Sequence, residues 1–245
     1  INEISKTKAN IILACDQRLI SIFKRSFKKA DFIKTTKKKV DFQIYIGDLG
    51  KLYRNHIDNF PKSQKFLSVN KDLSSKFQTY LESFGPSFKI GISWKTSSKT
   101  NSKHRSIQLN GWKDILTTKQ CTFFNLQYGN TKDEIQEIEN NYSVKIHSHP
   151  EIDPLIDLDS FISFIDALDL VISVDNSTVH FSGSIGKATF LMLPTPPDWR
   201  WMLDRDDSPW YNSIKLFRQK KPQEWDNVIS DVKSALDDII NYRKK

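Results

Sequence analysis

A group of polar residues that directly follows an apolar run is the part of this chain best suited to chemistry. Residues 170–174 are mostly apolar, and Asp175, Asn176 and Ser177 come next, with His180 on the first turn of an expected helix. The N-terminus of a helix presents unpaired backbone N–H groups and the positive end of the helix dipole, and both attract anions. The segment therefore predicts a binding site for a phosphorylated ligand, in particular a nucleotide diphosphate.

His180 and Asp175 could each act in more than one way. A histidine at a helix start is expected to be neutral, because the dipole disfavours a second positive charge there. We expect His180 to donate a hydrogen bond to a phosphate or a departing group rather than to bind a metal. Asp175 has the alternative of capping the helix, and capping can coexist with ligand binding.

Two further polar segments follow expected strands. Residues 95–107 are rich in hydroxyl and basic side chains, among them Lys99, Lys103 and Arg105, which could neutralise phosphate oxygens. An ordinary surface loop is the alternative. Gln127 ends the next expected strand and could form a hydrogen bond to a base, or could simply mark the exit of that strand.

The loop over residues 193–211 contains more aromatic and charged side chains than packing requires. Its first part holds Asp198, Trp199, Arg200 and Trp201. Indole rings stack on the apolar faces of sugars, while carboxylates and guanidinium groups bind hydroxyls. We therefore expect this loop to contact a sugar or an acceptor.

Several familiar motifs are absent from the sequence. It contains no GxGxxG, GxxxxGK[ST], HExxH or GxSxG pattern, which removes the main support for a dinucleotide dehydrogenase, an NTPase, a zincin or an α/β-hydrolase. His147, His149 and Asp153 could imitate metal ligands, but histidines two apart at a strand end are more often surface residues. We expect neither a metal nor a cofactor.

Composition limits the possible partners. The 245 residues are 38% hydrophobic and 12% aromatic, enough for a sizeable core, and carry a net charge of +8. The basic run 24–39 matches no nucleic-acid module, so we expect a solvated lysine face, with an anionic surface as the alternative. Asp166 and Asp169 interrupt the longest apolar run, which excludes a membrane span there. We expect a cytoplasmic protein, with contact to the inner membrane through its lysines as an option.

The elements that must position these residues follow from the alternation of strand-like and helical runs, which predicts an α/β fold around a parallel sheet. Cys15 and Cys121 lie in strand-like runs and are expected to be buried thiols. The expected strands are 10–15, 42–46, 88–94, 122–127, 144–146, 170–174, 189–193 and 214–217. The expected helices are 18–27, 71–84, 112–117, 133–140, 158–168, 177–185 and 223–242. A Gly-Pro-Ser breaker at 85–87 divides a partial α/β domain (1–86) from a Rossmann-like domain (87–222), with residues 223–245 as a closing helix.

Residues 169–194 resemble the D-L-V-I-[ST]-x-D-[ST]-x-x-x-H-x-x-[GA]-A-x-G-K-P signature of glycosyltransferase family 9, the heptosyltransferase-like enzymes. Residues 197–219 resemble the version found in bacterial proteins that join tetratricopeptide repeats to such a domain. The resemblance implies a GT-B architecture, in which the C-terminal domain holds the sugar nucleotide and the closing helix returns toward the first domain. By matching motif, it implies a diphosphate bordered by Asp175, Asn176, Ser177 and His180, a phosphate contact from Lys103 or Arg105, and a base or ribose near Gln127.

The implied activity is inverting, metal-independent transfer of a sugar from a nucleoside-diphosphate sugar to a glycan, lipid or protein acceptor. The chain departs from the family at Lys187-Ala188, where Lys-Pro is usual. The Gly-rich loop and catalytic carboxylate of the N-terminal domain have no counterpart, so we expect the base upstream of Ile1; Asp16 and Asp48 are stand-ins without motif support. A catalytically silent nucleotide- or glycan-binding module is the main alternative, and a sugar-nucleotide epimerase is a weaker one.

Overall fold

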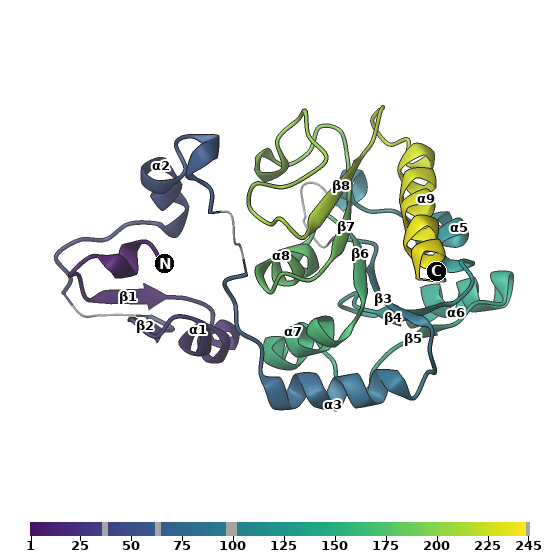
Figure 1. Cartoon of the computed structure of the whole chain (residues 1–245), viewed down its shortest axis with the longest axis horizontal. Coiled ribbons are helices and arrows are strands. Elements are labelled where there is room, and N and C mark those ends of the chain that lie inside the picture. Colours follow the sequence, from purple (N-terminus) through teal and green to yellow (C-terminus); the bar gives the residue numbers. More distant parts are fainter. Residues whose placement is uncertain (36–38, 62–64, 97–101, 244–245) are drawn as a thin grey trace.

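A six-stranded parallel sheet forms the centre of the molecule (Figure 1). The structure is a computed structural model that describes residues 1–35, 39–61, 65–96 and 102–243. The strands are β3 (Phe88–Ser93), β4 (Cys121–Asn125), β5 (Ile146–His147), β6 (Leu170–Val174), β7 (Thr189–Leu193) and β8 (Ile214–Arg218). Their order is β5-β4-β3-β6-β7-β8, so the chain reverses its direction of winding between β3 and β6. This is the Rossmann order, and the predicted α/β fold is confirmed.

The sheet is buried on both faces because helices cover each of them. Every residue of β3, β6 and β7 is buried, as expected for parallel strands with apolar runs. On one face α3 (Lys71–Glu82) and α7 (Leu158–Ala167) pack together, with the Phe77 and Phe164 rings 5.3 Å apart. Gly91 of β3 permits close packing on the α7 side, since a Cβ there would lie 2.4 Å from the Leu126 side chain.

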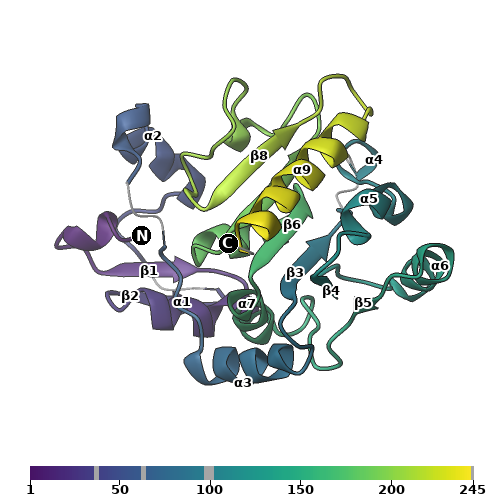
Figure 2. The ribbon, with the colours of Figure 1, turned by 45° about the vertical axis from the view of Figure 1, so that its right-hand side comes forward.

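The closing helix covers the opposite face. α9 (Asp226–Tyr242) packs with α5 (Lys113–Leu116) and the sheet, as Figure 2 shows. Val228, Val232 and Leu236 of α9 are fully buried in that core. The expectation that this helix returns toward the first domain is wrong, because its apolar side is needed to complete the core of the sheet, at the end of the molecule far from β1 and β2 (Figure 1).

The N-terminal part is small and shares its core with the sheet domain. β1 (Ile11–Ala14) and β2 (Ala30–Ile33) form a parallel pair connected by α1 (Ile20–Ser26). Ile22 and Phe32 belong to the same apolar cluster as α3 and α7. Arg25 binds both carboxylate oxygens of Asp159 on α7, which fastens the two parts together. α3 precedes residue 86 in the chain, yet it packs on the sheet domain. The boundary expected at residues 85–87 therefore does not separate two packed units.

One expected strand is absent. Residues 42–46 carry strand-like residues, but the structure places them in an extended segment followed by a 3-10 turn, and Phe42 is 95% exposed. Without a neighbouring strand to hydrogen-bond, β propensity alone does not make a strand. The remaining expected elements occur with ends shifted by a few residues, and the other helices are α2 (Leu49–Tyr53), α4 (Ser102–Arg105), α6 (Lys132–Tyr142) and α8 (Ser177–Ser184).

Neither cysteine forms a disulfide bond. Cys15 and Cys121 are free and half-buried, and burial raises the pKa of the Cys121 thiol to about 11. Among the described residues, no helix is long and apolar enough to cross a membrane.

Candidate functional site

The carboxyl ends of β3 and β6 lie side by side at the reversal point of the sheet, where the loops leaving them diverge. Open α/β sheets bind ligands outside the carboxyl ends of the strands at such a point, and the region around Ser93, Asp175 and Asn176 is called the crevice below. Asn176, the N-cap of α8, joins the two ends: its Oδ1 accepts from the Thr178 N–H at 3.0 Å, and its Nδ2 donates to Ser93 Oγ at 2.7 Å. The alternative role of Asp175 as the cap is therefore wrong.

Gln127 shapes the turn after β3. Its Oε1 accepts hydrogen bonds from Ser93 Oγ, the Trp94 N–H and the Lys95 N–H at 2.9–3.1 Å, and its Nε2 donates to the Tyr128 carbonyl at 3.4 Å. The side chain is buried. A contact between Gln127 and a base, as the resemblance implies, would require these bonds to break. Gln127 instead supports the loop that carries the cations.

Asp175 is a buried carboxylate beside the crevice. Only 4% of it is exposed, and Oδ1 accepts from Trp201 Nε1 at 3.0 Å. Arg105 Nη1 lies 3.1 Å from Oδ2 as an ion pair, but no described group donates a hydrogen bond to that oxygen. Burial raises the pKa of Asp175, while the bond from Trp201 and the charge of Arg105 oppose the rise. Asp175 thus holds the Arg105 guanidinium close to the N-cap of α8.

Arg105 is shared between two carboxylates. Its Nη2 lies 3.3 Å from Asp198 Oδ2, and Asp198 also accepts from Arg200 Nη1 at 2.8 Å. Burial alone would raise the pKa of Asp198, but the hydrogen bonds from Arg200 and the charges of both arginines bring it below its usual value. Lys103, on the same short helix, is exposed, whereas Lys99 lies outside the described residues. The structure therefore brings Arg105 to Asp175 and Asp198.

The first turn of α8 faces the same region. Ser177 is exposed at the start of the helix. His180 Nδ1 lies 3.1 Å from the Tyr211 hydroxyl, and the imidazole stacks on Trp201 with the ring centroids 5.4 Å apart. Burial, followed by the charge of Arg200, lowers the pKa of His180 to about 4. His180 is neutral at pH 7, as expected, although burial is the larger cause and not the helix dipole.

The two neighbouring tryptophans of the loop have different environments. Trp201 is 0% exposed, so the expectation that it stacks on a sugar is wrong: its ring packs under His180 and its N–H holds Asp175. Trp199 is 68% exposed, with the Arg200 guanidinium 4.7 Å from its ring centroid. Of the predicted loop residues, Asp198 and Arg200 join the charged network and Trp199 faces outward.

Other candidate residues serve the fold. His147 and His149 pack edge-on against Phe84 and Tyr80, each at 4.5 Å. In the part of the chain that the structure describes, no three His, Cys, Asp or Glu side chains are placed to hold a metal ion.

The two carboxylates considered as stand-in bases are ion-paired. Asp16 is bonded to Arg18, which lowers its pKa to about 2, and Asp48 lies 3.1 Å from Lys51. A carboxylate with so low a pKa is a weak general base.

The sequence pattern did not point to Ser93, and it included Tyr211 only as the last residue of the loop over residues 193–211. Ser93 is the last residue of a buried strand. Only the folded arrangement brings them to Asn176 and His180, so no spacing in the sequence could have shown it.

A bacterial protein shares part of its sequence with this chain. No family model matches the chain. It is 29% identical over 246 residues to Protein FlbA of Caulobacter vibrioides, covering 93% of this chain and 41% of FlbA.

A solved heptosyltransferase structure resembles this chain in fold. An E. coli ADP-heptose lps heptosyltransferase II superposes with a TM-score of 0.53 at 10% identity, over 77% of this chain and 57% of the enzyme. A glycosyl transferase family 9 protein from Veillonella parvula gives a TM-score of 0.48 at 10% identity, over 78% of this chain and 52% of that protein. The chain thus spans about two-fifths of FlbA and somewhat over half of heptosyltransferase II. The fold of the chain is GT-B-like.

Proposed function

We propose that this chain is a glycosyltransferase domain that uses a nucleoside-diphosphate sugar. One observation carries the proposal: at the reversal point of a GT-B-like sheet, the first turn of α8 lies beside an arginine that two carboxylates hold in place. A helix N-terminus and an adjacent guanidinium both favour a phosphate. The similarity in fold to a heptosyltransferase supports the same activity.

The mechanism proposed is direct displacement with inversion and without a metal. The acceptor hydroxyl forms a bond to the anomeric carbon as the bond from that carbon to the diphosphate oxygen breaks, and a general base takes the hydroxyl proton. The N-terminus of α8, Ser177, neutral His180 and Arg105 would stabilise the charge that develops on the departing diphosphate, with Lys103 close enough in the chain to contribute. Neither Asp16 nor Asp48 is assigned as the base.

Isothermal titration with UDP, GDP and ADP tests the donor site. We expect at least one nucleotide to bind, and the double variant Asp175→Ala with His180→Ala to bind it at least ten-fold more weakly. A control replaces two exposed carboxylates of α9, Asp231→Ala with Asp238→Ala, and circular dichroism checks that each variant is folded. If no nucleotide binds to the wild type, or if the double variant binds as well as the control, the proposal is wrong.

A catalytically silent binding module is the second candidate. Its support is that both carboxylates described beside the crevice, Asp175 and Asp198, are ion-paired with arginines rather than available as bases. Mass spectrometry of a nucleotide sugar incubated with the protein separates the two candidates. Release of the nucleoside diphosphate supports the enzyme, whereas binding without turnover over a panel of acceptors supports the silent module.

A further inference from the structure

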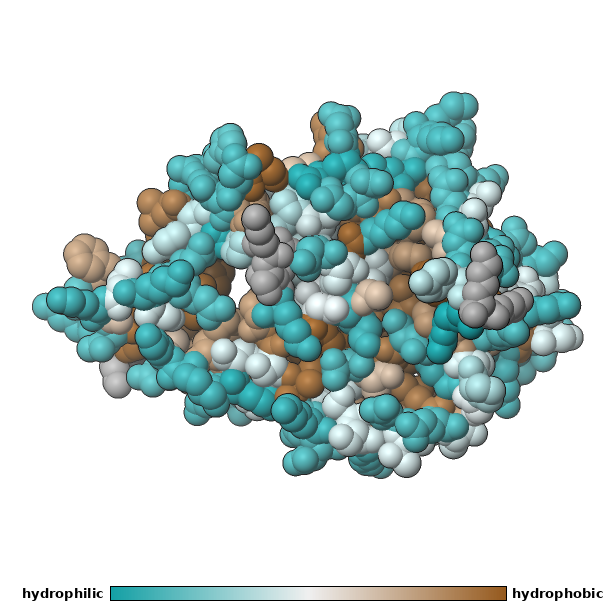
Figure 3. Space-filling view, in the orientation of Figure 1, coloured by the Kyte–Doolittle hydropathy of each residue, from teal (hydrophilic) through white to brown (hydrophobic). Residues whose placement is uncertain are grey.

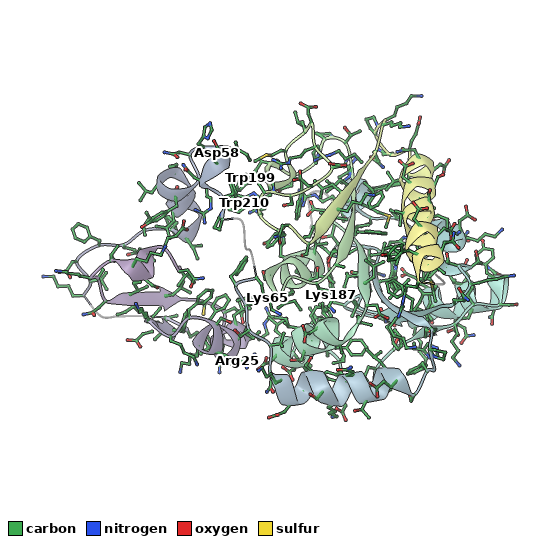
Figure 4. All side chains as sticks on the ribbon, in the orientation of Figure 1. Arg25, Asp58, Lys65, Lys187, Trp199 and Trp210 are labelled. Atoms are coloured by element: carbon green, nitrogen blue, oxygen red, sulfur yellow. The ribbon has the colours of Figure 1, made fainter. Side chains whose placement is uncertain are left out.

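A cavity lies between the N-terminal part and the loop over residues 193–211. It has a volume of about 820 Å³, and its walls include Arg54 and Phe60 on one side and Trp199, Leu203, Asp204 and Trp210 on the other. Figure 4 shows Asp58, from the N-terminal part, next to Trp199 and Trp210 of the loop. The volume is typical of a site for a small organic molecule.

A ring contact joins the two walls, and an ion pair fixes the wall from the N-terminal part. The rings of Phe60 and Trp210 meet edge to face, with their centroids 4.8 Å apart. Arg54 donates two hydrogen bonds of 2.7 Å to the carboxylate of Glu3, and its guanidinium lies 5.6 Å from the Phe60 ring centroid. The segment carrying Phe60 is thus anchored on both sides, so the cavity is a built feature of the fold.

The side chains in this cavity combine an open indole with carboxylates. Trp199 is largely exposed and meets the edge of Trp210, with the ring centroids 6.1 Å apart. Asp204 and Asp207 are exposed at the rim, where Arg205 pairs with Asp207. An indole face packs against the C–H face of a pyranose, and carboxylates accept hydrogen bonds from its hydroxyls. This combination is suited to a saccharide.

A membrane surface fits the same residues less well. Apolar side chains do reach the surface where α2 and the loop approach each other (Figure 3), and Leu52 and Leu203 are among those exposed. However, the cavity is concave, and the carboxylate of Asp204 would repel anionic lipid headgroups, whereas the arginines of the cavity, Arg54 and Arg205, are paired with Glu3 and Asp207. Both features favour an uncharged saccharide over a bilayer.

We propose that this cavity binds a saccharide and that this saccharide is the acceptor of the transfer reaction. The role as acceptor rests on the proposed function, while the binding itself does not. The loop connects the two sites: Asp198 contacts Arg105 at the crevice, and the next residue, Trp199, lines the cavity. A saccharide held on Trp199 would therefore lie next to the loop residues that contact Arg105.

Saturation-transfer difference NMR with a mixture of methyl glycosides of glucose, galactose, mannose and N-acetylglucosamine tests the binding. We expect saturation transfer to the ring protons of at least one glycoside, reduced at least five-fold in Trp199→Ala and reduced in Asp204→Asn. The matched control is Tyr242→Ala, which removes another exposed aromatic ring, at the far end of α9. It should leave the signal unchanged.

The failures of the two proposals are distinguishable. A wild-type protein that binds nucleotide but gives no glycoside signal, or a signal that Trp199→Ala leaves intact, overturns the cavity proposal alone. A Trp199-dependent signal without nucleotide binding supports the cavity and contradicts the donor site. Cosedimentation with phosphatidylglycerol vesicles is the third measurement. Vesicle binding that is lost in Trp199→Ala, without any glycoside signal, would assign the surface to a membrane instead.

Discussion

The crevice at β3 and β6 and the cavity beside residues 54–60 are built in opposite ways. The crevice is lined by polar side chains that are almost wholly buried and bonded to one another, as Asn176 and Gln127 are. The cavity is lined by exposed and half-buried side chains, which include Trp199 and Phe60. Buried residues such as Asn176 and Gln127 therefore mainly shape the site, while the accessible side chains come from the loop over residues 193–211.

Trp199 and Trp201 test this comparison directly, because they are of the same residue type and lie two positions apart but differ in burial. Trp201→Ala should lower the free energy of unfolding by about 3–5 kcal/mol, since it leaves a cavity and removes the donor to Asp175. Trp199→Ala should change it by less than about 0.5 kcal/mol. Urea denaturation of both variants measures the difference. Equal losses would mean that the two environments are not distinct.

The burial of His180 predicts that the stability of the protein depends on pH. The pKa of His180 is lowered from 6.5 to about 4, so the unfolded chain takes up this proton at a higher pH than the folded chain does. The contribution of His180 to stability is complete above pH 6.5 and is lost as the pH falls toward 4. At about 1.4 kcal/mol for each pH unit, the loss reaches about 3 kcal/mol.

The measurement is the free energy of unfolding at several pH values, compared between the wild type and His180→Gln. The difference between the two should shrink as the pH falls through this range. His147 and His149 also have lowered pKa values, but they are present in both proteins and cancel. Parallel curves for the two proteins would show that His180 is not buried as described.

Nucleotide binding should distinguish two basic residues on the same short helix. Arg105→Gln should weaken binding of the preferred nucleotide about ten-fold, or about 1.4 kcal/mol, because it removes the guanidinium that Asp175 and Asp198 position. Lys103→Gln should weaken it by less than about three-fold, since an exposed lysine gives a screened contact. Titration calorimetry at two salt concentrations measures both. A larger effect from Lys103 would reverse the assignment.

The sequence predicted the sheet well because the buried parallel strands are apolar runs with few other interpretations. It also predicted that Asp175 stands just before a helix and that His180 lies on the first turn of that helix, because a strand that leads into a helix start is a local pattern. It could not predict that Trp201 and Gln127 point inward, since side-chain direction depends on contacts with Asp175 and Ser93, which are distant in the chain. The cavity was missed for the same reason: nothing local connects Phe60 to Trp210.

The smallest expected effect comes from the segment whose predicted strand does not form. Phe42→Ser should change the free energy of unfolding by less than about 0.5 kcal/mol, because the side chain is almost fully exposed and has no apolar contacts to lose. Phe32→Ser is the matched control: it removes the same ring from the shared core of α1, α3 and α7 and should cost about 3 kcal/mol or more. Urea denaturation compares the two. A loss at Phe42 close to that at Phe32 would show that residues 42–46 are packed after all, and that the N-terminal part is as well buried as the sheet domain.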